Sequence, residues 1–182
     1  MAEVAWPAKA EIIRQDLRLD FPGQVKMSSP KSGGTVVLDS SYGIWIGNCF
    51  ISITEDGSTI EAFFNALAGV RNVVEMPLHR PTIGESANIT SATAGTMILD
   101  SRPSNLEVGS YIRYEKGCYS IVAVTSGANP TITTEPIIAG ATGKIDPALT
   151  MRVRSSDLPP LSPRNLSWWG PWSFSFEESR IE

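Results

Sequence analysis

A short stretch near the C-terminal end, WSFSFEE, constrains the fold of this chain more than any other segment. Aromatic residues and serines alternate over five positions: Trp172, Ser173, Phe174, Ser175 and Phe176. Aromatic side chains at every second position are typical of a β-strand with one buried side and one solvent-facing side. A single strand is unstable in water and must pair with strands formed elsewhere. Segments 10–21 and 44–54 carry matching alternation, so one of them is the predicted partner.

The composition favours a strand-rich protein with a core of ordinary size. The chain has 182 residues, of which 42% are hydrophobic and 19% charged, enough for one domain or two small ones. It contains 15 glycines and 13 prolines, which indicate many turns. Short segments between frequent turns favour strands over long helices.

Charge and hydropathy argue against two kinds of partner. The net charge is −4 and no dense cluster of Lys and Arg is present, so sequence-specific binding of nucleic acid through a basic face is not expected. The apolar stretches are much shorter than the roughly 20 residues of a membrane-spanning helix, so we expect no membrane insertion. The sequence MAEVAWPAKAEIIRQ lacks a basic segment followed by an apolar run, so no signal peptide is expected.

The first half of the chain contains several predicted strands. In segment 10–21 the residues Ile13, Gln15 and Leu17 share one parity, while charged residues occupy the other. The following sequence, QVKMSSPKSGGTVVL, is predicted to form two strands joined by an exposed turn. These patterns indicate a sheet with one buried face.

Segment 44–54 is also a predicted strand, but its large side chains do not follow one parity. Trp45, Phe50 and Ile53 cannot all lie on the same face of a regular strand. An extra residue at a β-bulge would restore a common face. We therefore expect a bulge near Gly47-Asn48.

One amphipathic helix is predicted in the sequence GSTIEAFFNALAG. Ser58 and Glu61 have the spacing of a capping box, in which each side chain satisfies a backbone donor of the first turn. Gly69 fits the position that follows a helix. Four apolar residues form a single stripe at the i, i+3, i+4, i+7 spacing: Ile60, Phe63, Phe64 and Leu67. The helix is expected to pack on the sheet formed by the flanking strands.

The amino-acid composition changes in the middle of the chain, and the pattern there predicts a second β unit. Residues 84–95 are small and polar and read as a linker, and residues 158–164 are rich in proline. Between them lie several short predicted strands, including a hairpin in which Lys116-Gly117 forms the turn and Gly117 supplies a positive φ. Insertions are tolerated where both ends leave the host fold at exposed turns.

The predicted fold class is therefore mainly β. A β-barrel or sandwich host domain, flanked by one short α-helix, is expected to comprise residues 1–83 and 168–182. Residues 84–167 are expected to form an inserted small antiparallel, barrel-like β domain with its exit linker. The predicted core of the host domain consists of large apolar residues: Trp45, Phe63, Phe64, Leu67, Trp172, Phe174 and Phe176.

No set of residues predicts catalysis, a metal site or a cofactor. His79 is the only histidine, and no partner for it is evident in the sequence. Cys49 and Cys118 fall within apparent strands and are expected to be buried thiols and not a disulfide. The sequence IIAGATGKI lacks the first glycine and the final hydroxyl residue of a phosphate-binding loop. We therefore expect a protein that is not an enzyme and that carries no cofactor.

The tryptophans suggest a second class of function. Exposed indole rings can stack on sugars or on a partner protein. For Trp172 its place in the alternating strand favours core packing, whereas Trp168 and Trp169 could be either packed or partner-facing. A carbohydrate-binding or receptor-binding β module that uses exposed tryptophans is thus the alternative hypothesis.

The order of segments resembles a family of small tail proteins of tailed bacteriophages. The resemblance covers nearly the whole chain and rests on five stretches: IEAFFNALAGVRNVVEMPLHRPT, GSYIRYEKGCYSIVAV, TTEPIIAG, MRVRSS and WSFSFEE. These stretches are similar to those of distal tail proteins, which lie where the tail tube meets the baseplate or tail tip.

The resemblance implies a structural protein of the virion, assembled in the cytoplasm of the bacterial host. It implies a ring, expected to be a hexamer, that joins the tail tube protein to the baseplate or tail-tip hub protein. It also implies a β-barrel or sandwich with a helix and an inserted β domain. The family contributes no catalytic residues to this sequence, and the low basic charge suits a lumen through which DNA passes.

Overall fold

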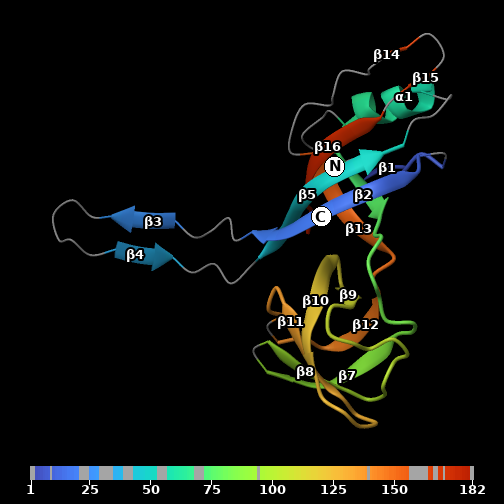
Figure 1. Cartoon of the computed structure of the whole chain (residues 1–182). Coiled ribbons are helices and arrows are strands. Elements are labelled where there is room, and N and C mark those ends of the chain that lie inside the picture. The colour runs from blue at the N-terminus through green and yellow to red at the C-terminus, as the bar shows by residue number, and fades with distance from the viewer. Residues whose placement is uncertain are drawn as a thin grey trace. The chain divides into compact units, whose positions relative to one another are not determined.

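Over the residues that it describes, the computed structural model shows a mainly β protein with one helix (Figure 1). For residues 25–28, 35–38, 164–165 and 168–169 the description covers the backbone only. The structure describes the following residues: 3–8, 10–20, 25–28, 35–38, 43–52, 57–67, 72–93, 95–138, 140–155, 164–165, 168–169 and 171–180. No helix in this part of the chain is both long enough and apolar enough to cross a membrane.

The chain divides into two compact units. The first contains residues 1–18, 45–79 and 148–182, and the second contains residues 19–44 and 80–147. Each unit therefore combines segments that lie far apart in the sequence.

A six-stranded mixed sheet forms the first unit. Its strand order is β1-β6-β13-β16-β5-β2; β1 is parallel to β6, and the pairs from β6 through to β5 are antiparallel. The bounds are β1 Glu3–Val4, β2 Ile12–Asp20, β5 Ile44–Ile51, β6 Val73–Pro77, β13 Thr150–Ser155 and β16 Trp172–Glu178. Two short pairs lie outside this sheet: β3 Val25–Ser28 with β4 Thr35–Leu38, and β14 Arg164–Asn165 with β15 Trp168–Trp169.

The aromatic strand β16 lies inside this sheet, between β5 and β13. Its pairing with β5 confirms the predicted partner segment 44–54. Trp172, Phe174 and Phe176 are all buried, as their alternation predicts, whereas Ser173 is exposed. Burial of three large aromatic side chains on one strand makes β16 a major contributor to the core.

A carboxylate occupies the next position on the same buried face. Glu178 is 3% exposed, and its Oε2 accepts hydrogen bonds from the Trp45 backbone N–H at 3.3 Å and from Arg180 Nη2 at 2.8 Å. Both partners reduce the cost of burying the charge.

Helix α1, Gly57–Leu67, packs its apolar stripe against the first unit. Ile60, Phe63, Phe64 and Leu67 are buried, in agreement with their predicted spacing. The ring centroid of Phe64 lies 5.5 Å from that of Phe174 in a T-shaped contact, which ties the helix to β16. The aromatic contacts explain how a helix of only three turns is held in place.

The helix begins two residues earlier than a cap at Ser58 predicts, since such a cap would make Thr59 the first helical residue. The helix begins at Gly57, so Ser58 lies within its first turn and not at the cap position before it. The capping-box spacing does not determine which residue starts the helix, and Gly57 is itself buried there. Gly69, the predicted residue after the helix, lies outside the described residues.

Strand β5 is regular where a bulge was expected. Its register against β16 is uninterrupted from Ile46 to Ile51, so the predicted bulge is absent from this pairing. Trp45, Cys49 and Ile51 are buried on one face, while Phe50 lies half-buried on the other, and Ile53 lies outside the described residues. Without a bulge, positions 45 and 50 point to opposite faces, and on the outer face Arg14 covers the Phe50 ring, with the guanidinium carbon 5.3 Å from the ring centroid.

The side chain of Gln15 connects β2 with the chain that follows β6. Its Nε2 donates to the Pro77 carbonyl at 2.6 Å, and its Oε1 accepts from the His79 N–H at 3.0 Å. Because β2 and β6 are separated by three strands in the sheet order, these bonds indicate that the sheet curves back on itself.

The predicted parity of β2 holds only after its first residues. Gln15 is buried, but Ile13 is 60% exposed and Ile12 is buried in its place. Ile13 and its neighbour Arg14 are both exposed, so the predicted alternation begins only at Gln15.

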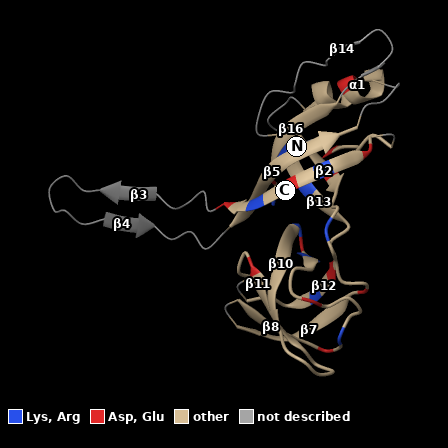
Figure 2. Ribbon diagram, in the orientation of Figure 1, with Lys and Arg blue, Asp and Glu red and all other residues tan. Residues whose placement is uncertain are grey.

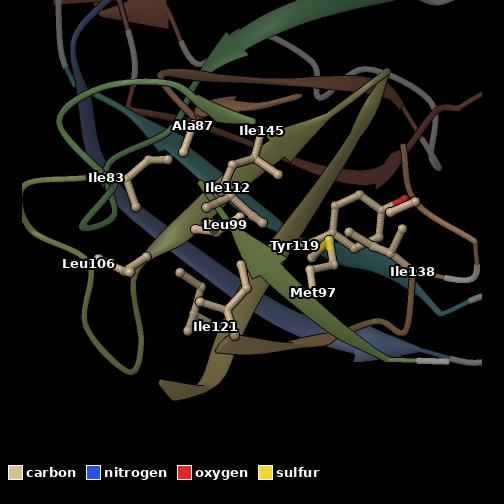
Figure 3. Packing of buried hydrophobic residues seen from close by; sticks show 12 residues of the cluster. Ile83, Ala87, Met97, Leu99, Leu106, Ile112, Tyr119, Ile121, Ile138 and Ile145 are labelled. Atoms are coloured by element: carbon tan, nitrogen blue, oxygen red, sulfur yellow. The ribbon is translucent and has the colours of Figure 1, made fainter. Parts of the chain in front are cut away.

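The second unit is a closed barrel of six antiparallel strands in the order β10-β11-β8-β7-β12-β9. The bounds are β7 Ala87–Thr93, β8 Thr96–Leu99, β9 Tyr111–Tyr114, β10 Gly117–Val124, β11 Thr131–Glu135 and β12 Gly143–Pro147. Figure 3 shows side chains from these strands and their loops gathered in the interior. The core consists of Ile83, Ala87, Met97, Leu99, Leu106, Ile112, Tyr119, Ile121, Ile132, Ile138, Ala141 and Ile145.

Two details of the barrel differ from the sequence interpretation. The polar stretch 84–95 contains strand β7 and is not a linker, because Ala87 reaches the core and β-branched residues follow it along the strand. In the hairpin β9–β10 the positive φ belongs to Glu115 and not to Gly117. Gly117 is required for space instead, since a Cβ there would lie 2.7 Å from the Tyr119 hydroxyl.

Strand β13 shows that the predicted inserted segment 84–167 ends too late. Residues Thr150–Ser155 pair with β6 and β16 in the sheet of the first unit. The sequence pattern of a short amphipathic strand does not specify which unit it joins, and the apolar Met151 and Val153 are buried in the sheet. The chain leaves the first unit after His79 and returns at Ala148.

The two exit points of the barrel segment are adjacent in the first unit. Thr150 pairs with Pro77, and the Leu78 N–H donates to the Leu149 carbonyl at 3.0 Å. Strands β6 and β13 therefore form an antiparallel pair connected by residues 78–149, and the barrel segment 80–147 lies within this connection.

Candidate functional site

A pocket of about 350 Å³ opens on the first unit, where three neighbouring strands meet. Strands β2, β5 and β16 all contribute to its walls. The lining residues are Asp16, Leu17, Arg18, Ile46, Gly47, Asn48, Ser175 and Phe176. The size lies within the range of roughly 300–1,000 Å³ typical of small ligand sites.

Asp16 is held in a two-point contact with Arg14 on the same strand. Arg14 Nε donates to Asp16 Oδ1 at 2.9 Å, and Arg14 Nη2 lies 2.9 Å from Asp16 Oδ2. The Arg14 guanidinium also lies over the Phe50 ring. The negative charge of Asp16 is thus compensated by Arg14 within β2. The guanidinium of Arg14 is in turn held by its contact with the Phe50 ring.

Asn48 and Ser175 are joined across the paired strands β5 and β16. The Ser175 hydroxyl donates to Asn48 Oδ1 at 2.9 Å, and the two residues are partners in the register. This bond fixes the orientation of the amide. The Asn48 Nδ2 group, a donor of two hydrogen bonds, has no acceptor within the described part of the chain.

Arg18 supplies the uncompensated charge of the pocket. It is exposed and makes no ion pair or hydrogen bond with any other residue that the structure describes. On β16 the nearest carboxylate beyond the pocket, Glu177, is paired with Arg154 of β13. The carboxylates of Asp16 and Glu177 are therefore both paired with arginines. Among the described residues, the Arg18 guanidinium has no such partner.

This arrangement offers both hydrogen-bond donors and apolar walls to a ligand. Arg18 and Asn48 present donors, while Leu17, Ile46 and Phe176 provide apolar walls. A guanidinium fork is well matched to a planar carboxylate. Among the described residues, the side-chain hydrogen bonds of the lining residues are those of Asp16 with Arg14 and of Ser175 with Asn48, and neither is a nucleophile–base pair.

Apart from Phe176, the residues singled out from the sequence do not line the pocket. All seven predicted core residues are buried: Trp45, Phe63, Phe64, Leu67, Trp172, Phe174 and Phe176. His79 is exposed, and its backbone N–H is held by Gln15. Cys49 and Cys118 are both buried free thiols in different units. Of the lining residues, only Phe176 was among the predicted site residues.

The charged surface elsewhere is mixed. Figure 2 shows Lys and Arg interspersed with Asp and Glu over the described ribbon, without a large region of one sign. Within the described residues, no group of three His, Cys, Asp or Glu side chains is placed to hold a metal ion.

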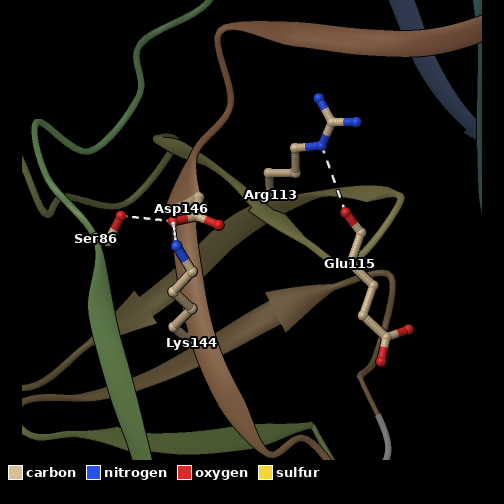
Figure 4. A network of polar contacts seen from close by, with 5 residues as sticks. All are labelled: Ser86, Arg113, Glu115, Lys144 and Asp146. Atoms are coloured by element: carbon tan, nitrogen blue, oxygen red, sulfur yellow. Dashed lines mark hydrogen bonds and ion pairs between the residues drawn. The ribbon is translucent and has the colours of Figure 1, made fainter.

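A second polar cluster lies on the barrel, and its groups are hydrogen-bonded or ion-paired with one another (Figure 4). Asp146 accepts a hydrogen bond from the Ser86 hydroxyl at 2.5 Å and lies 3.0 Å from Lys144 Nζ. The Ser86 hydrogen bond is the main cause that lowers the pKa of Asp146, and Lys144 adds to it. Nearby, Arg113 Nε donates to the Glu115 carbonyl. We assign this cluster to stabilisation of the barrel surface.

The sequence contained a weak signal for the pocket. Asp16 and Arg18 lie on the charged parity of segment 10–21, and Asn48 is a polar residue in a strand. Their meeting depends on the order β16-β5-β2, which no local pattern specifies.

The comparison with models of known protein families finds no match, and neither does the comparison with curated proteins.

Proposed function

We propose that this protein is a structural component of a bacteriophage tail. It forms a ring, expected to be a hexamer, that joins the tail tube to the baseplate or tail-tip hub. The virion is then its final location, after assembly in the bacterial cytoplasm. The proposal takes its starting point from the family resemblance of the sequence and gains support from one structural feature.

That feature is the long edge strand of the first unit. Among the described residues β2 is the last strand of the sheet, and it runs over nine residues from Ile12 to Asp20. The bonds from β2 to the chain after β6 are made by the Gln15 side chain, and the backbone donors and acceptors at the edge of a sheet can pair with another chain. Ile13 on this strand is 60% exposed, so it adds an apolar contact to the edge. A contact between unlike surfaces of successive copies generates a ring when the rotation closes.

The alternative is a carbohydrate-binding or receptor-binding module. Trp172 is 1% exposed and is not available for stacking on a ligand. Trp168 and Trp169 form β15, and their side chains lie outside what the structure describes. The edge strand therefore favours assembly over glycan recognition.

The test of the proposed function is the mass of the assembled particle. We expect native mass spectrometry to detect a species of about six times the 19.7 kDa chain mass, alone or after addition of a tail tube protein. The variant Ile13→Lys should weaken this species, because a charge on the edge strand opposes pairing with a second chain. The matched control is Ile98→Lys, which changes an exposed isoleucine of the barrel strand β8.

Two results would contradict the proposal. One is a chain that stays monomeric at every concentration and with every tail protein tested. The other is specific binding to a glycan array by a monomeric protein, which would support the alternative.

A further inference from the structure

We propose that the pocket on β2, β5 and β16 binds a carboxylate-bearing segment of a partner protein, an acidic residue flanked by an apolar one. This inference deepens the proposed function and rests on it, since the partner would be a neighbouring protein of the assembly. Its chemistry follows from the charges, the donors and the walls of the pocket.

The charge of the pocket selects an anion. Asp16 is compensated by Arg14 at 2.9 Å, and Glu177 is compensated by Arg154. Asp20, further along β2, does not line the pocket. The remaining charge among the lining residues is that of Arg18.

The donors select a planar anion with two acceptor atoms. Arg18 offers the parallel N–H groups of its guanidinium, and Asn48 Nδ2 is a further donor whose direction is set by the Ser175 hydrogen bond. A carboxylate can accept from both groups at once. One guanidinium and one amide are a small donor set for the higher charge of a phosphate group.

The walls select an apolar neighbour next to that carboxylate. Leu17, Ile46 and Phe176 line the pocket, and Gly47 contributes no side chain to fill it. Phe176 is already buried, but a free small anion would leave the half-buried side chains of Leu17 and Ile46 in contact with water. A peptide with an apolar residue beside its acidic residue would cover them and gain from their burial.

The experiment uses the 182-residue chain with two blocked dipeptides, N-acetyl-Leu-Glu-amide and N-acetyl-Leu-Gln-amide. Saturation-transfer NMR detects weak binding on the peptide signals and works for large assemblies. We expect signals from both the leucine and the glutamate side chains, and an affinity for the glutamate peptide about tenfold higher than for the glutamine peptide.

Three variants test the assignment of the residues. Arg18→Gln should lower the affinity for the glutamate peptide about tenfold, because it removes the free charge. Arg14→Gln should also lower it, although Arg14 does not line the pocket, because it exposes the Asp16 charge to the ligand. Lys144→Gln, which removes an exposed charge on the barrel, should leave the affinity unchanged. Thermal unfolding of each variant establishes that it is folded.

Several outcomes would overturn the inference. Equal binding of the two dipeptides would show that the carboxylate is not recognised. Displacement of the glutamate peptide by equimolar acetate or phosphate would show that the pocket binds small anions and that its apolar walls add nothing to the affinity. An unchanged affinity in Arg18→Gln would place the binding elsewhere.

The ring assay separates this inference from the proposed function. A ring that forms without any binding of the glutamate peptide would remove the pocket inference and leave the proposed function intact. Selective binding of that peptide by a chain that never assembles would support the pocket and contradict the ring.

Discussion

At position 47, strand β5 has no room for a side chain. A Cβ on Gly47 would lie 1.8 Å from the backbone oxygen of Asp16 and 3.2 Å from the ring of Phe176. We expect Gly47→Ala to lower the free energy of unfolding of the first unit by about 1–3 kcal/mol or more, because the obstacle is backbone and cannot rotate away. Urea denaturation followed by circular dichroism measures this change.

Gly84→Ala is the matched control for that substitution. Its Cβ would also meet a close atom, the Ser104 hydroxyl at 2.2 Å, but a serine side chain can adopt another rotamer. A Gly47→Ala variant no less stable than the Gly84→Ala variant would contradict the close approach of β2 and β5.

Burial of Cys49 also has a consequence at the residue scale. Desolvation raises the pKa of its thiol from 9.0 to about 12. Below pH 9 the thiol is protonated in both the folded and the unfolded state, so its contribution to the free energy of unfolding does not change with pH. Between about pH 9 and 12 the unfolded state ionises first, so stability should fall by up to about 1.4 kcal/mol per pH unit.

Comparison with Cys49→Ala isolates this contribution from other groups that titrate at high pH. We expect the unfolding free energy of the variant to decline less steeply with pH in that window. Identical slopes for the two proteins would show that the thiol is not shielded from water.

At the scale of elements, helix α1 depends on its aromatic contact with the sheet. Phe64 is 3% exposed and packs against Phe174 of β16. We expect Phe64→Ala to cost about 3–5 kcal/mol, because it leaves a cavity between the helix and the sheet. The exposed neighbour Asn65 gives the control, and Asn65→Ala should change stability by less than about 0.5 kcal/mol. Equal melting temperatures for the two variants would contradict the packing of the helix.

At the scale of the whole molecule, the barrel is an insertion between two paired strands. Because Leu78 and Leu149 are hydrogen-bonded, a short turn can replace the barrel. We expect a chain with residues 80–147 replaced by Asn-Gly to retain a folded first unit. The separate fragment 80–147 should fold as well, since all six barrel strands and its core come from it. Cooperative thermal unfolding of each product is the measurement.

A longer deletion provides the contrast for this prediction. Replacing residues 86–160 removes β13, which lies between β6 and β16 in the sheet. That product should not fold, because removal of an interior strand leaves its neighbours unpaired. A folded product from the longer deletion would mean that β13 is dispensable to the sheet.

Local patterns in the sequence determined the elements with clear periodicity. The stripe of α1 and the alternation of β16 could both be predicted, because burial on one face places apolar residues at regular intervals along the sequence. The mainly β class and the existence of a second β unit followed from the same patterns and from the frequency of turns.

The tertiary structure alone decided which strands become neighbours. The pattern of β13 fits either unit, and only its pairing with β6 and β16 assigns it to the first. The role of Gly117 likewise depends on where the Tyr119 ring lies. The pocket needs Arg18, Asn48 and Ser175 on three adjacent strands, two of them more than 100 residues apart, as the Asn48–Ser175 bond shows. Strand order depends on the free energy of packing over the whole core. Short-range periodicity in the sequence does not specify that order.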